Sequence, residues 1–389
     1  MIKLAVIGFG SRISAVIAGF RHMNNTVRVM GIMDPDEKGA TERLHDRDKE
    51  DVRFYKSLDK MIREVKPDAL VIGTQCNLHS KFAIQAAKYD LPLYLEKPVA
   101  IDMKSARALE KAFEKSKCEV VVSFPLRVSP IAIKTKELID SNELDPQHIM
   151  AYNYVPYGRG YWEHFYRDYT ISGGLFLQKA THDLDYITFL MGKKITRISA
   201  MGTFNLFKGK KRAGLTCAKC KEVESCLESP LNRRMGDYGG GHDHKCFFSK
   251  DLNDPETANE DSSSCLMQFE DGSHGTYNQV FYSLRDTGMR GSRISSYKGT
   301  IEFNWYKNKI HLMKHFDSFK ADYSPQGKDA GHFGGDHALS WDFVNLIQGI
   351  SKSRTPIETG IQSAYNCLAA RESMHSGKLV NVRQVGQVK

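Results

Sequence analysis

The chain has 389 residues, of which 41% are hydrophobic and 26% charged, a composition typical of a soluble globular protein with room for two domains. No apolar stretch approaches the roughly 20 residues that span a bilayer, and no secretory signal precedes the first predicted strand, so we expect a cytoplasmic protein without a membrane partner. The net charge of +9 is modest for this length. Its one short basic cluster, residues 208–212, is interpreted as a solvated loop, so we expect no nucleic acid partner.

The N-terminal residues predict a strand, a glycine turn and a helix in immediate succession. Residues 2–7 are almost entirely apolar, as a strand buried on both faces requires, and Gly8 and Gly10 follow directly. The small and apolar residues 13–20 then predict a helix. Such a turn presents main-chain N–H groups and a helix N-terminus to a pyrophosphate, so we predict a dinucleotide site here. Ile13 stands where the usual fingerprint has its third glycine.

Asp34 is the second part of that fingerprint. Residues 27–33 predict another strand, and Asp34 ends it about 20 residues beyond the glycines. A carboxylate at this place accepts hydrogen bonds from the adenosine ribose and repels a 2′-phosphate, so the predicted cofactor is NAD rather than NADP. The alternative is that Asp34 is only a turn residue in the sequence Asp-Pro-Asp.

The alternation of strands and helices continues to residue 123. Further strands are expected at residues 53–55, 69–73, 91–95 and 119–123, and helices at residues 38–46, 57–64, 80–89 and 105–115. This alternation predicts a doubly wound parallel sheet that binds ligands at the carboxyl ends of its strands. We therefore assign residues 1–123 to an NAD-binding Rossmann domain.

Beyond residue 123 the pattern changes. Strands are expected at residues 149–155, 195–204, 264–269, 275–281, 293–297, 300–305 and 309–314. Helices are expected at residues 130–139, 181–191, 336–348 and 359–375. Because Gly and Asp-Gly turns separate several of the strands, residues 124–389 are predicted to form an α+β domain with an open, mainly antiparallel sheet. The predicted fold class is therefore α/β, with a cysteine-containing insertion at about 205–263 in the second domain.

Three later motifs carry a resemblance to a known family. They are Gly-Thr-Gln-Cys-Asn-Leu-His at 73–79, Leu-Glu-Lys-Pro at 95–98, and Gly-Gly at 173–174 ahead of Lys-Ala-Thr-His-Asp-Leu-Asp at 179–185. With the glycine turn, and in this order, they resemble the glucose–fructose oxidoreductase and inositol dehydrogenase family (Gfo/Idh/MocA) over essentially the whole chain. The resemblance implies an enzyme that transfers a hydride from a secondary hydroxyl of a sugar or cyclitol to a nicotinamide.

Two residues match the catalytic residues of that family. Lys97 would polarise the substrate oxygen, and the charge of NAD+ would lower its pKa. His182 would be the general base, because an imidazole titrates near neutral pH. On a helix, Asp185 lies on the same face as His182 and would bind a substrate hydroxyl or set the histidine tautomer. The alternatives are a surface lysine at a strand end and a His–Asp pair that only packs an interface.

The chain departs from the commoner family pattern immediately before His182. Where many relatives have an aspartate, this chain has Gln178, and Lys179 would be an additional active-site cation. This arrangement looks more like a subgroup that includes NAD-dependent glycosidases. Those enzymes oxidise a sugar hydroxyl, eliminate the aglycone, add water and reduce the sugar again with the same NAD.

The resemblance and the turn chemistry together give a set of binding residues. The predicted cofactor-binding residues are Gly8, Gly10, Ser11, Arg12, Asp34, Thr74, Asn77, His79, Glu96 and Lys97. Residues 157–168 are dense in aromatic and polar side chains, which stack on sugar rings and bind hydroxyls or carboxylates. The predicted substrate-binding residues are Arg127, Tyr161, Trp162, His164 and Arg167, for each of which ordinary packing is the alternative.

The insertion contains four cysteines that predict a metal site. Cys217 and Cys220 form a C-x-x-C pair, and Cys226 and Cys246 follow. Four thiolates suit tetrahedral zinc, with His242 and His244 as alternative ligands, so we predict a structural zinc ion. An iron–sulfur cluster and free cysteines in a loop are the alternatives.

The sequence thus predicts an NAD-dependent oxidoreductase acting on a carbohydrate or glycoside. One alternative is a redox-neutral NAD-dependent glycoside hydrolase, and a second is a non-catalytic NAD-binding sensor. Because the second sheet of this family often serves as a dimer interface, the resemblance also implies a homo-oligomer.

Overall fold

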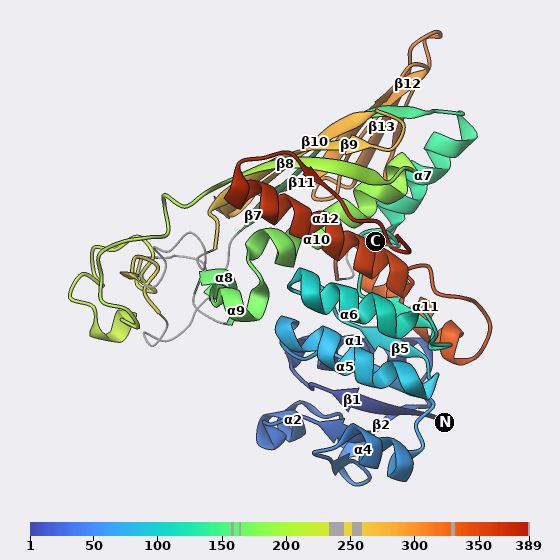
Figure 1. The fold of residues 1–389 in the computed structure, drawn as a ribbon, viewed down its shortest axis with the longest axis vertical. Coiled ribbons are helices and arrows are strands. Elements are labelled where there is room, and N and C mark those ends of the chain that lie inside the picture. The colour runs from blue at the N-terminus through green and yellow to red at the C-terminus, as the bar shows by residue number, and fades with distance from the viewer. Residues whose placement is uncertain (157–158, 163–164, 233–244, 251–258, 328–330, 388–389) are drawn as a thin grey trace.

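The computed structural model describes residues 1–156, 159–162, 165–232, 245–250, 259–327 and 331–387. Within these residues the chain forms a six-stranded sheet, near the bottom of Figure 1, and a nine-stranded sheet, near the top. The first sheet is parallel throughout and the second is mainly antiparallel. The predicted α/β fold class is therefore confirmed.

The first sheet has the strand order β3-β2-β1-β4-β5-β6. Its strands are β1 (Ile2–Ile7), β2 (Val27–Met33), β3 (Arg53–Phe54), β4 (Ala69–Ile72), β5 (Leu93–Leu95) and β6 (Val120–Val122). Its helices are α1 (Ser11–Met23), α2 (Glu37–Arg43), α3 (Asp46–Lys49), α4 (Leu58–Val65), α5 (Cys76–Ala86) and α6 (Met103–Phe113), with a 3₁₀ turn at Ala87–Tyr89. The order reverses between β1 and β4, and ligands of doubly wound sheets bind at such a switch point.

The second sheet has the order β14-β13-β12-β11-β7-β10-β9-β8-β15, and only the β7–β10 pairing is parallel. Its strands are β7 (Pro146–Pro156), β8 (Ile195–Thr203), β9 (Ser262–Phe269), β10 (His274–Ser283), β11 (Met289–Ser296), β12 (Gly299–Asn304), β13 (Lys309–Lys314), β14 (Lys320–Tyr323) and β15 (Val380–Asn381). The helices of this half are α7 (Pro130–Ser141), α8 (Arg159–Trp162), α9 (Tyr169–Ser172), α10 (Leu175–Met191), α11 (Gly335–Ile347) and α12 (Ile357–Ser376). Short 3₁₀ turns lie at Phe165–Arg167, Cys217–Lys219 and Arg285–Thr287.

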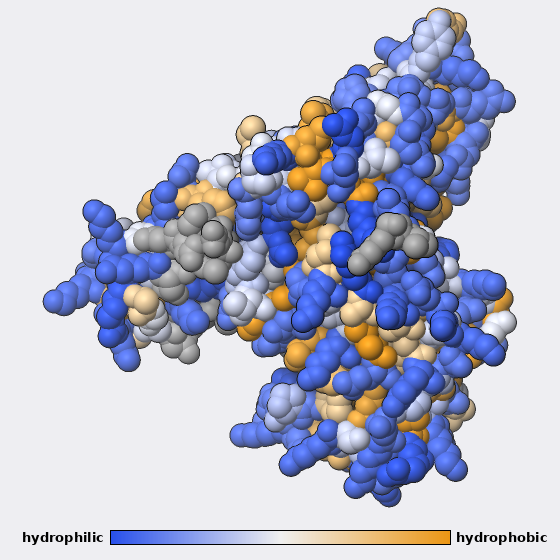
Figure 2. Space-filling model, viewed as in Figure 1, coloured by the Kyte–Doolittle hydropathy of each residue, from blue (hydrophilic) through white to orange (hydrophobic). Residues whose placement is uncertain are grey.

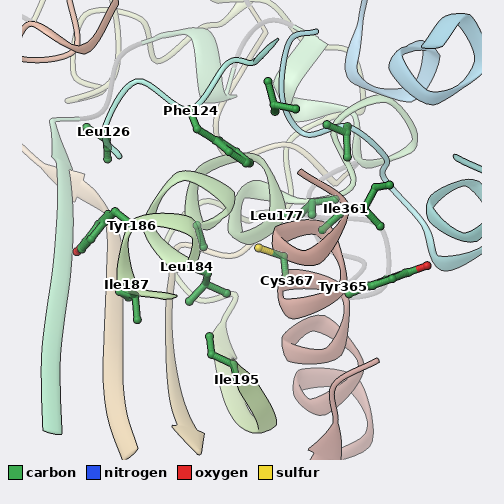
Figure 3. Close-up of a cluster of buried hydrophobic side chains, with 14 of the residues drawn as sticks. Phe124, Leu126, Leu177, Leu184, Tyr186, Ile187, Ile195, Ile361, Tyr365 and Cys367 are labelled. Atoms are coloured by element: carbon green, nitrogen blue, oxygen red, sulfur yellow. The ribbon is translucent and has the colours of Figure 1, made fainter. Parts of the chain in front are cut away.

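Helix α10 is held in place by α12 and by the second sheet. Leu177 and Leu184 on α10 lie in one buried cluster with Ile361 and Cys367 on α12 (Figure 3). This packing is important for the site because α10 carries the predicted catalytic histidine.

A buried ion pair fixes the same helix to the sheet. Arg290 on β11 donates from Nε and Nη2 to the two carboxylate oxygens of Asp183, at 2.8 and 2.7 Å. The Tyr277 hydroxyl and the Asn153 amide also donate to this carboxylate, at 2.9 and 3.1 Å. Because every one of these side chains is buried, removing one partner would leave an uncompensated polar group.

Helix α10 begins earlier than the sequence pattern predicts, at Leu175 instead of residue 181. Gly173 and Gly174, with φ of +73° and +94°, make the turn that starts it. The buried carboxylate of Glu260, which lies just before β9, accepts a hydrogen bond from the Phe176 N–H in the first turn. The residues just before His182 are therefore helical.

Although α11 follows the second sheet in sequence, it packs on the first. Leu339 and Phe343 belong to the buried cluster formed by β1, α1 and β2. The ring centres of Phe343 and Phe20 lie 4.9 Å apart. This packing brings the residues just before α11 to the carboxyl ends of the parallel strands.

The face drawn in Figure 2 is mostly hydrophilic, and apolar residues gather towards the middle of the view. Among the helices of the described residues, none has both the length and the apolar composition that crossing a membrane requires.

Candidate active site

A cavity of about 1110 Å³ extends from the ends of β1, β2 and β4 to the N-terminal half of α10. Both halves of the chain contribute to its lining. The predicted site residues that line it are Gly8, Gly10, Ser11, Arg12, Asp34, Thr74, His79, Glu96, Lys97, Tyr161, Lys179 and His182. The structure therefore brings the glycine turn, the Glu-Lys-Pro motif and the histidine helix together at one place.

The glycine turn leaves room for a pyrophosphate. Gly8 has a φ of +79°, and a Cβ atom there would lie 2.7 Å from the main-chain nitrogen of Thr74. A Cβ at Gly10 would meet nothing within 4 Å, and Gly10 starts α1 without a side-chain cap. The N-terminal N–H groups of α1 are thus not blocked by a side chain, and the turn fits the pyrophosphate of a dinucleotide.

Asp34 fits the adenosine ribose at the end of β2. Its carboxylate accepts hydrogen bonds from the N–H groups of Phe9 and Asp36, at 2.6 and 2.8 Å. These two bonds fix the carboxylate beside the glycine turn. Because an ionised carboxylate can accept about four hydrogen bonds, it still has capacity for ribose hydroxyls.

Two predicted cofactor residues, Arg12 and Glu96, bind each other. Arg12 donates from Nε to Glu96 at 2.9 Å, and from Nη1 and Nη2 to Asp336 on α11 at 3.0 and 2.7 Å. Burial would raise the pKa of Glu96, but the charges of Arg12 and Lys97 outweigh it and lower that pKa. Arg12 thus joins the first sheet to α11, and its guanidinium is already engaged by two carboxylates.

His79 and Thr74 lie at the start of α5. The buried ring of His79 faces the main-chain oxygens of Pro98 and Thr74, at 2.8 and 3.0 Å from its two nitrogens. This bridge ties the end of β4 to the segment that carries Lys97. Asn77 is not among the residues that line the cavity.

Lys97 enters the cavity after β5. Its Nζ donates a 3.0 Å hydrogen bond to the main-chain oxygen of Gln178 on α10. Burial, together with the charge of Lys179, lowers the pKa of Lys97 to about 7. The side chain can therefore change its proton occupancy near neutral pH, as an acid–base group must.

His182 is buried in the wall of the same cavity. Burial, and then the charge of Lys97, lowers its pKa well below the ordinary value, so the imidazole is neutral at neutral pH. Its Nδ1 has no hydrogen-bond partner in the part of the chain that the structure describes. A neutral imidazole that lines a cavity is chemically competent to accept a proton there.

The structure adds a second histidine that the sequence analysis did not single out. His332 lines the cavity, and its ring centre lies 5.7 Å from that of His182. Its Nδ1 lies 2.9 Å from Asp336, which fixes the orientation of the imidazole. The i, i+4 spacing of His332 and Asp336 was the available signal, but on its own it is common on protein surfaces.

Lys179 and three aromatic side chains also line the cavity. Tyr161, Phe165 and Tyr166 line it, and the ammonium of Lys179 lies 5.3 Å from the centre of the Tyr161 ring. Burial, and then the charge of Arg290, lowers the pKa of Lys179 to about 8.

Asp185 and Arg127 do not line the cavity. Arg127 donates from Nε and Nη2 to the carboxylate of Asp185, at 2.7 to 3.1 Å, and Asp185 is buried. The helical spacing to His182 is present, but the carboxylate is bound by Arg127, and Asp185 is not among the residues that line the cavity.

Trp162 and Arg167 also lie outside the lining. Trp162 is fully buried and packs on Phe207, with ring centres 4.3 Å apart. Arg167 donates to the main-chain oxygens of Trp162 and Cys246, so it attaches the insertion to α8. His164, another predicted substrate residue, falls outside the described residues.

Main-chain hydrogen bonds position the cysteines of the insertion. Cys220 donates its N–H to the Cys217 oxygen, and Cys246 donates its N–H to the oxygen of Leu215. Among the described residues, however, no group of three or more His, Cys, Asp or Glu side chains is arranged to hold a metal ion. The predicted zinc site thus has no support from these residues, and His242 and His244 lie outside them.

Both halves of the chain match models of one family. Residues 2–124 match the oxidoreductase family with the NAD-binding Rossmann fold, and residues 133–302 match the GFO/IDH/MocA C-terminal domain. The chain belongs to the Gfo/Idh/MocA family. It therefore shares with that family an NAD-binding oxidoreductase architecture.

Named relatives of the Gfo/Idh/MocA family show the same kinship. The chain is 24% identical to the putative oxidoreductase YteT of Bacillus subtilis over 323 residues, 74% of either chain. It is 24% identical to myo-inositol 2-dehydrogenase of Thermotoga maritima over 204 residues, 52% of this chain and 58% of that protein.

Solved structures of dehydrogenases share the Gfo/Idh/MocA fold over nearly the whole chain. A levoglucosan dehydrogenase in complex with NADH and levoglucosan is 17% identical, with a TM-score of 0.73 over 98% of this chain and 100% of that one. The WlbA dehydrogenase of Bordetella pertussis, in complex with NADH and UDP-GlcNAcA, is 18% identical, with a TM-score of 0.72 over 98% of this chain and 99% of that one.

Proposed function

We propose that the chain is an NAD-dependent dehydrogenase that oxidises a secondary hydroxyl of a sugar, cyclitol or glycoside. The observation that supports this most is the convergence of Lys97 and His182 on the cavity into which the glycine turn opens. Relatives named as inositol dehydrogenases, and a neighbouring structure that contains levoglucosan, favour a polyhydroxylated substrate.

The side chains can do the acid–base work of this oxidation. Bound NAD+ would supply the acceptor for the hydride, which leaves carbon with its electron pair. His182, neutral because of its burial, accepts the hydroxyl proton. Lys97, held by the Gln178 oxygen, donates a hydrogen bond to the substrate oxygen and stabilises the negative charge that develops there.

A second candidate is the redox-neutral cleavage of a glycoside. It needs one group to remove a carbon-bound proton after oxidation and another to protonate the departing oxygen, before water is added and the hydride is returned. His182 and His332, with ring centres 5.7 Å apart, supply two imidazoles in one cavity and favour this reaction specifically.

One experiment separates these candidates and the NAD-binding sensor. Purified protein would be given p-nitrophenyl glycosides without added cofactor, and then free sugars with NAD, while nitrophenol and NADH are followed. Accumulation of NADH from a free sugar supports the dehydrogenase. Nitrophenol release without net NADH, lost in His182→Asn, supports the glycosidase. Tight NAD binding without either reaction would contradict both and favour the sensor.

A self-associated form is also part of the proposal. Met150, Met201 and Leu266, on β7, β8 and β9, are 42, 78 and 50% exposed although they are apolar. This supports an interface between copies on the outer face of the second sheet. Light scattering of the wild type and of Leu266→Lys would test it.

For the insertion, the cysteine spacing remains the only support for zinc. Elemental analysis of protein purified without metal additives would test that prediction. One zinc per chain, lost in Cys217→Ser, would support it, and its absence in both proteins would contradict it.

A further inference from the structure

The charges around the cavity are unevenly distributed. Three acidic residues line it, and two of these, Asp34 and Glu37, lie at the end of β2 beside the glycine turn. The third, Glu96, is bound to Arg12. Apart from Asp34, Glu37 and Glu96, no described residue in the lining is acidic, and Lys179 and the aromatic side chains belong to the same lining.

Among the described residues, no carboxylate is paired with Lys179, although the charge of Asp183 acts on it. The nearest acidic residue on the helix, Asp183, already accepts four hydrogen bonds from Arg290, Tyr277 and Asn153. No ion pair joins Lys179 to another described residue, and its ammonium group lies 5.3 Å from the centre of the Tyr161 ring. Burial, and then the charge of Arg290, lowers the pKa of Lys179 to about 8, although the charge of Asp183 acts in the opposite direction.

We infer that the substrate sugar carries a carboxylate, as a uronic acid or a glycosiduronic acid does, and that Lys179 binds this carboxylate. The inference rests on the proposed function and names the substrate class of that site. Tyr161, Phe165 and Tyr166 provide apolar faces for the pyranose ring beside the ammonium group. A carboxylate on the same ring neutralises Lys179 while a hydroxyl of the sugar reaches Lys97 and His182.

A carboxylate suits this place better than a phosphate. Phosphate groups in proteins are typically bound by several donors, among which the N-terminal N–H groups of a helix are prominent. The helix end nearest to Lys179 is that of α10, where Phe176 donates its N–H to Glu260 and Gly174 donates its N–H to Ser172. A single lysine beside neutral aromatic rings therefore matches a singly charged group.

The test is equilibrium binding by calorimetry to the NADH-loaded protein, in which a hydroxyl substrate cannot be oxidised. The ligands are glucuronate, galacturonate and mannuronate, each paired with its neutral hexose, and the 6-phosphates of those hexoses. Because the uronate carboxylate would accept a charge-assisted hydrogen bond that the hexose cannot form, we expect at least one uronate to bind about 10- to 100-fold more tightly than its hexose. Lys179→Met should abolish that preference, Lys179→Arg should retain most of it, and the exposed Lys111→Met on α6 should leave it unchanged.

Several results would overturn the inference. These are equal binding of uronates and hexoses, tighter binding of a hexose phosphate than of every uronate, or a uronate preference that survives in Lys179→Met. Failure of the proposed function looks different. The uronate could bind through Lys179 while the NAD+ form of the protein produces no NADH from the uronate and releases no aglycone from uronate glycosides. That result would support the carboxylate site and contradict the proposed activity. If only neutral sugars are oxidised, the proposed dehydrogenase activity is supported and the carboxylate site at Lys179 is contradicted.

Discussion

Ile13 on α1 occupies the space that a side chain at Gly73 would need. A Cβ atom at Gly73 would lie 1.9 Å from Cγ1 of Ile13. Close packing between the first helix and the sheet, which the third glycine of the dinucleotide fingerprint ordinarily permits, is here achieved by a glycine on the neighbouring strand end. The missing glycine therefore does not prevent a Rossmann turn in this chain.

This relationship predicts strong coupling between the two positions. Gly73→Ala should lower the free energy of unfolding by about 1–3 kcal/mol through overpacking. Ile13→Ala should lower it by about 2–5 kcal/mol through the cavity it leaves. Because the new methyl group at position 73 would fill part of that cavity, the double variant should be more stable than the sum of the single effects implies. Chemical denaturation of all four proteins measures this, and additive effects would contradict the packing argument.

Asp34 should decide the choice of cofactor. Asp34→Ala removes the carboxylate that is fixed by the N–H groups of Phe9 and Asp36. The ratio of kcat/KM for NAD to that for NADP should fall by about tenfold or more, because charged hydrogen bonds to the ribose are lost and the repulsion of a 2′-phosphate is relieved. An unchanged ratio would mean that Asp34 only stabilises the glycine turn.

Lys97 and Lys179 should be linked through their charges. As the hydrogen-bond donor to the substrate oxygen, Lys97 must be protonated, so kcat/KM at saturating NAD should fall as the pH rises through about 7. Lys179→Met removes one of the charges that lower the pKa of Lys97, so this fall should move to higher pH. Lys111→Met should leave the profile in place. A profile that rises through this range, or that does not respond to Lys179→Met, would contradict the assigned role.

His332 should contribute to turnover through its place beside His182. His332→Gln removes an imidazole held by Asp336 at 2.9 Å, and we expect kcat to fall by about 10²-fold. The melting temperature and the NAD affinity of the His332→Gln variant should stay close to those of the wild type. The exposed His375→Gln at the end of α12 is the matched control. An unchanged kcat in His332→Gln would mean that His332 makes only a structural contact in the cavity wall.

The parts of the site that the sequence could predict are those built from local motifs. Gly8, Gly10 and Asp34 belong to one strand–turn–helix–strand unit, and Lys97 follows a strand of the same sheet. Because a parallel sheet brings the carboxyl ends of its strands together, their positions in the sequence were enough to place them beside one cavity.

The remaining parts depend on contacts between distant segments. His332 reaches the cavity because α11 packs on α1, and no local pattern indicates which sheet that helix will cover. Asp185 has the spacing expected of a partner for His182, but Arg127, far away in sequence, binds its carboxylate. Helix α10 starts early because the Glu260 carboxylate, just ahead of β9, accepts a hydrogen bond from the Phe176 N–H in its first turn. Such pairings are decided by tertiary structure and not by periodicity.

In the proposed reaction, Lys97 and His182 serve hydride transfer to a cofactor bound in this cavity. The most direct measurement is a single turnover of stoichiometric protein–NAD complex with a mixture of sugars, uronic acids and glycosides, followed by NADH fluorescence. This detects NADH whether it accumulates or is formed transiently. The account predicts a signal from the wild type that is lost in His182→Asn and in Lys97→Met, both of which still bind NAD. A signal of wild-type rate in either variant, or none in the wild type with NAD fully bound, would contradict it.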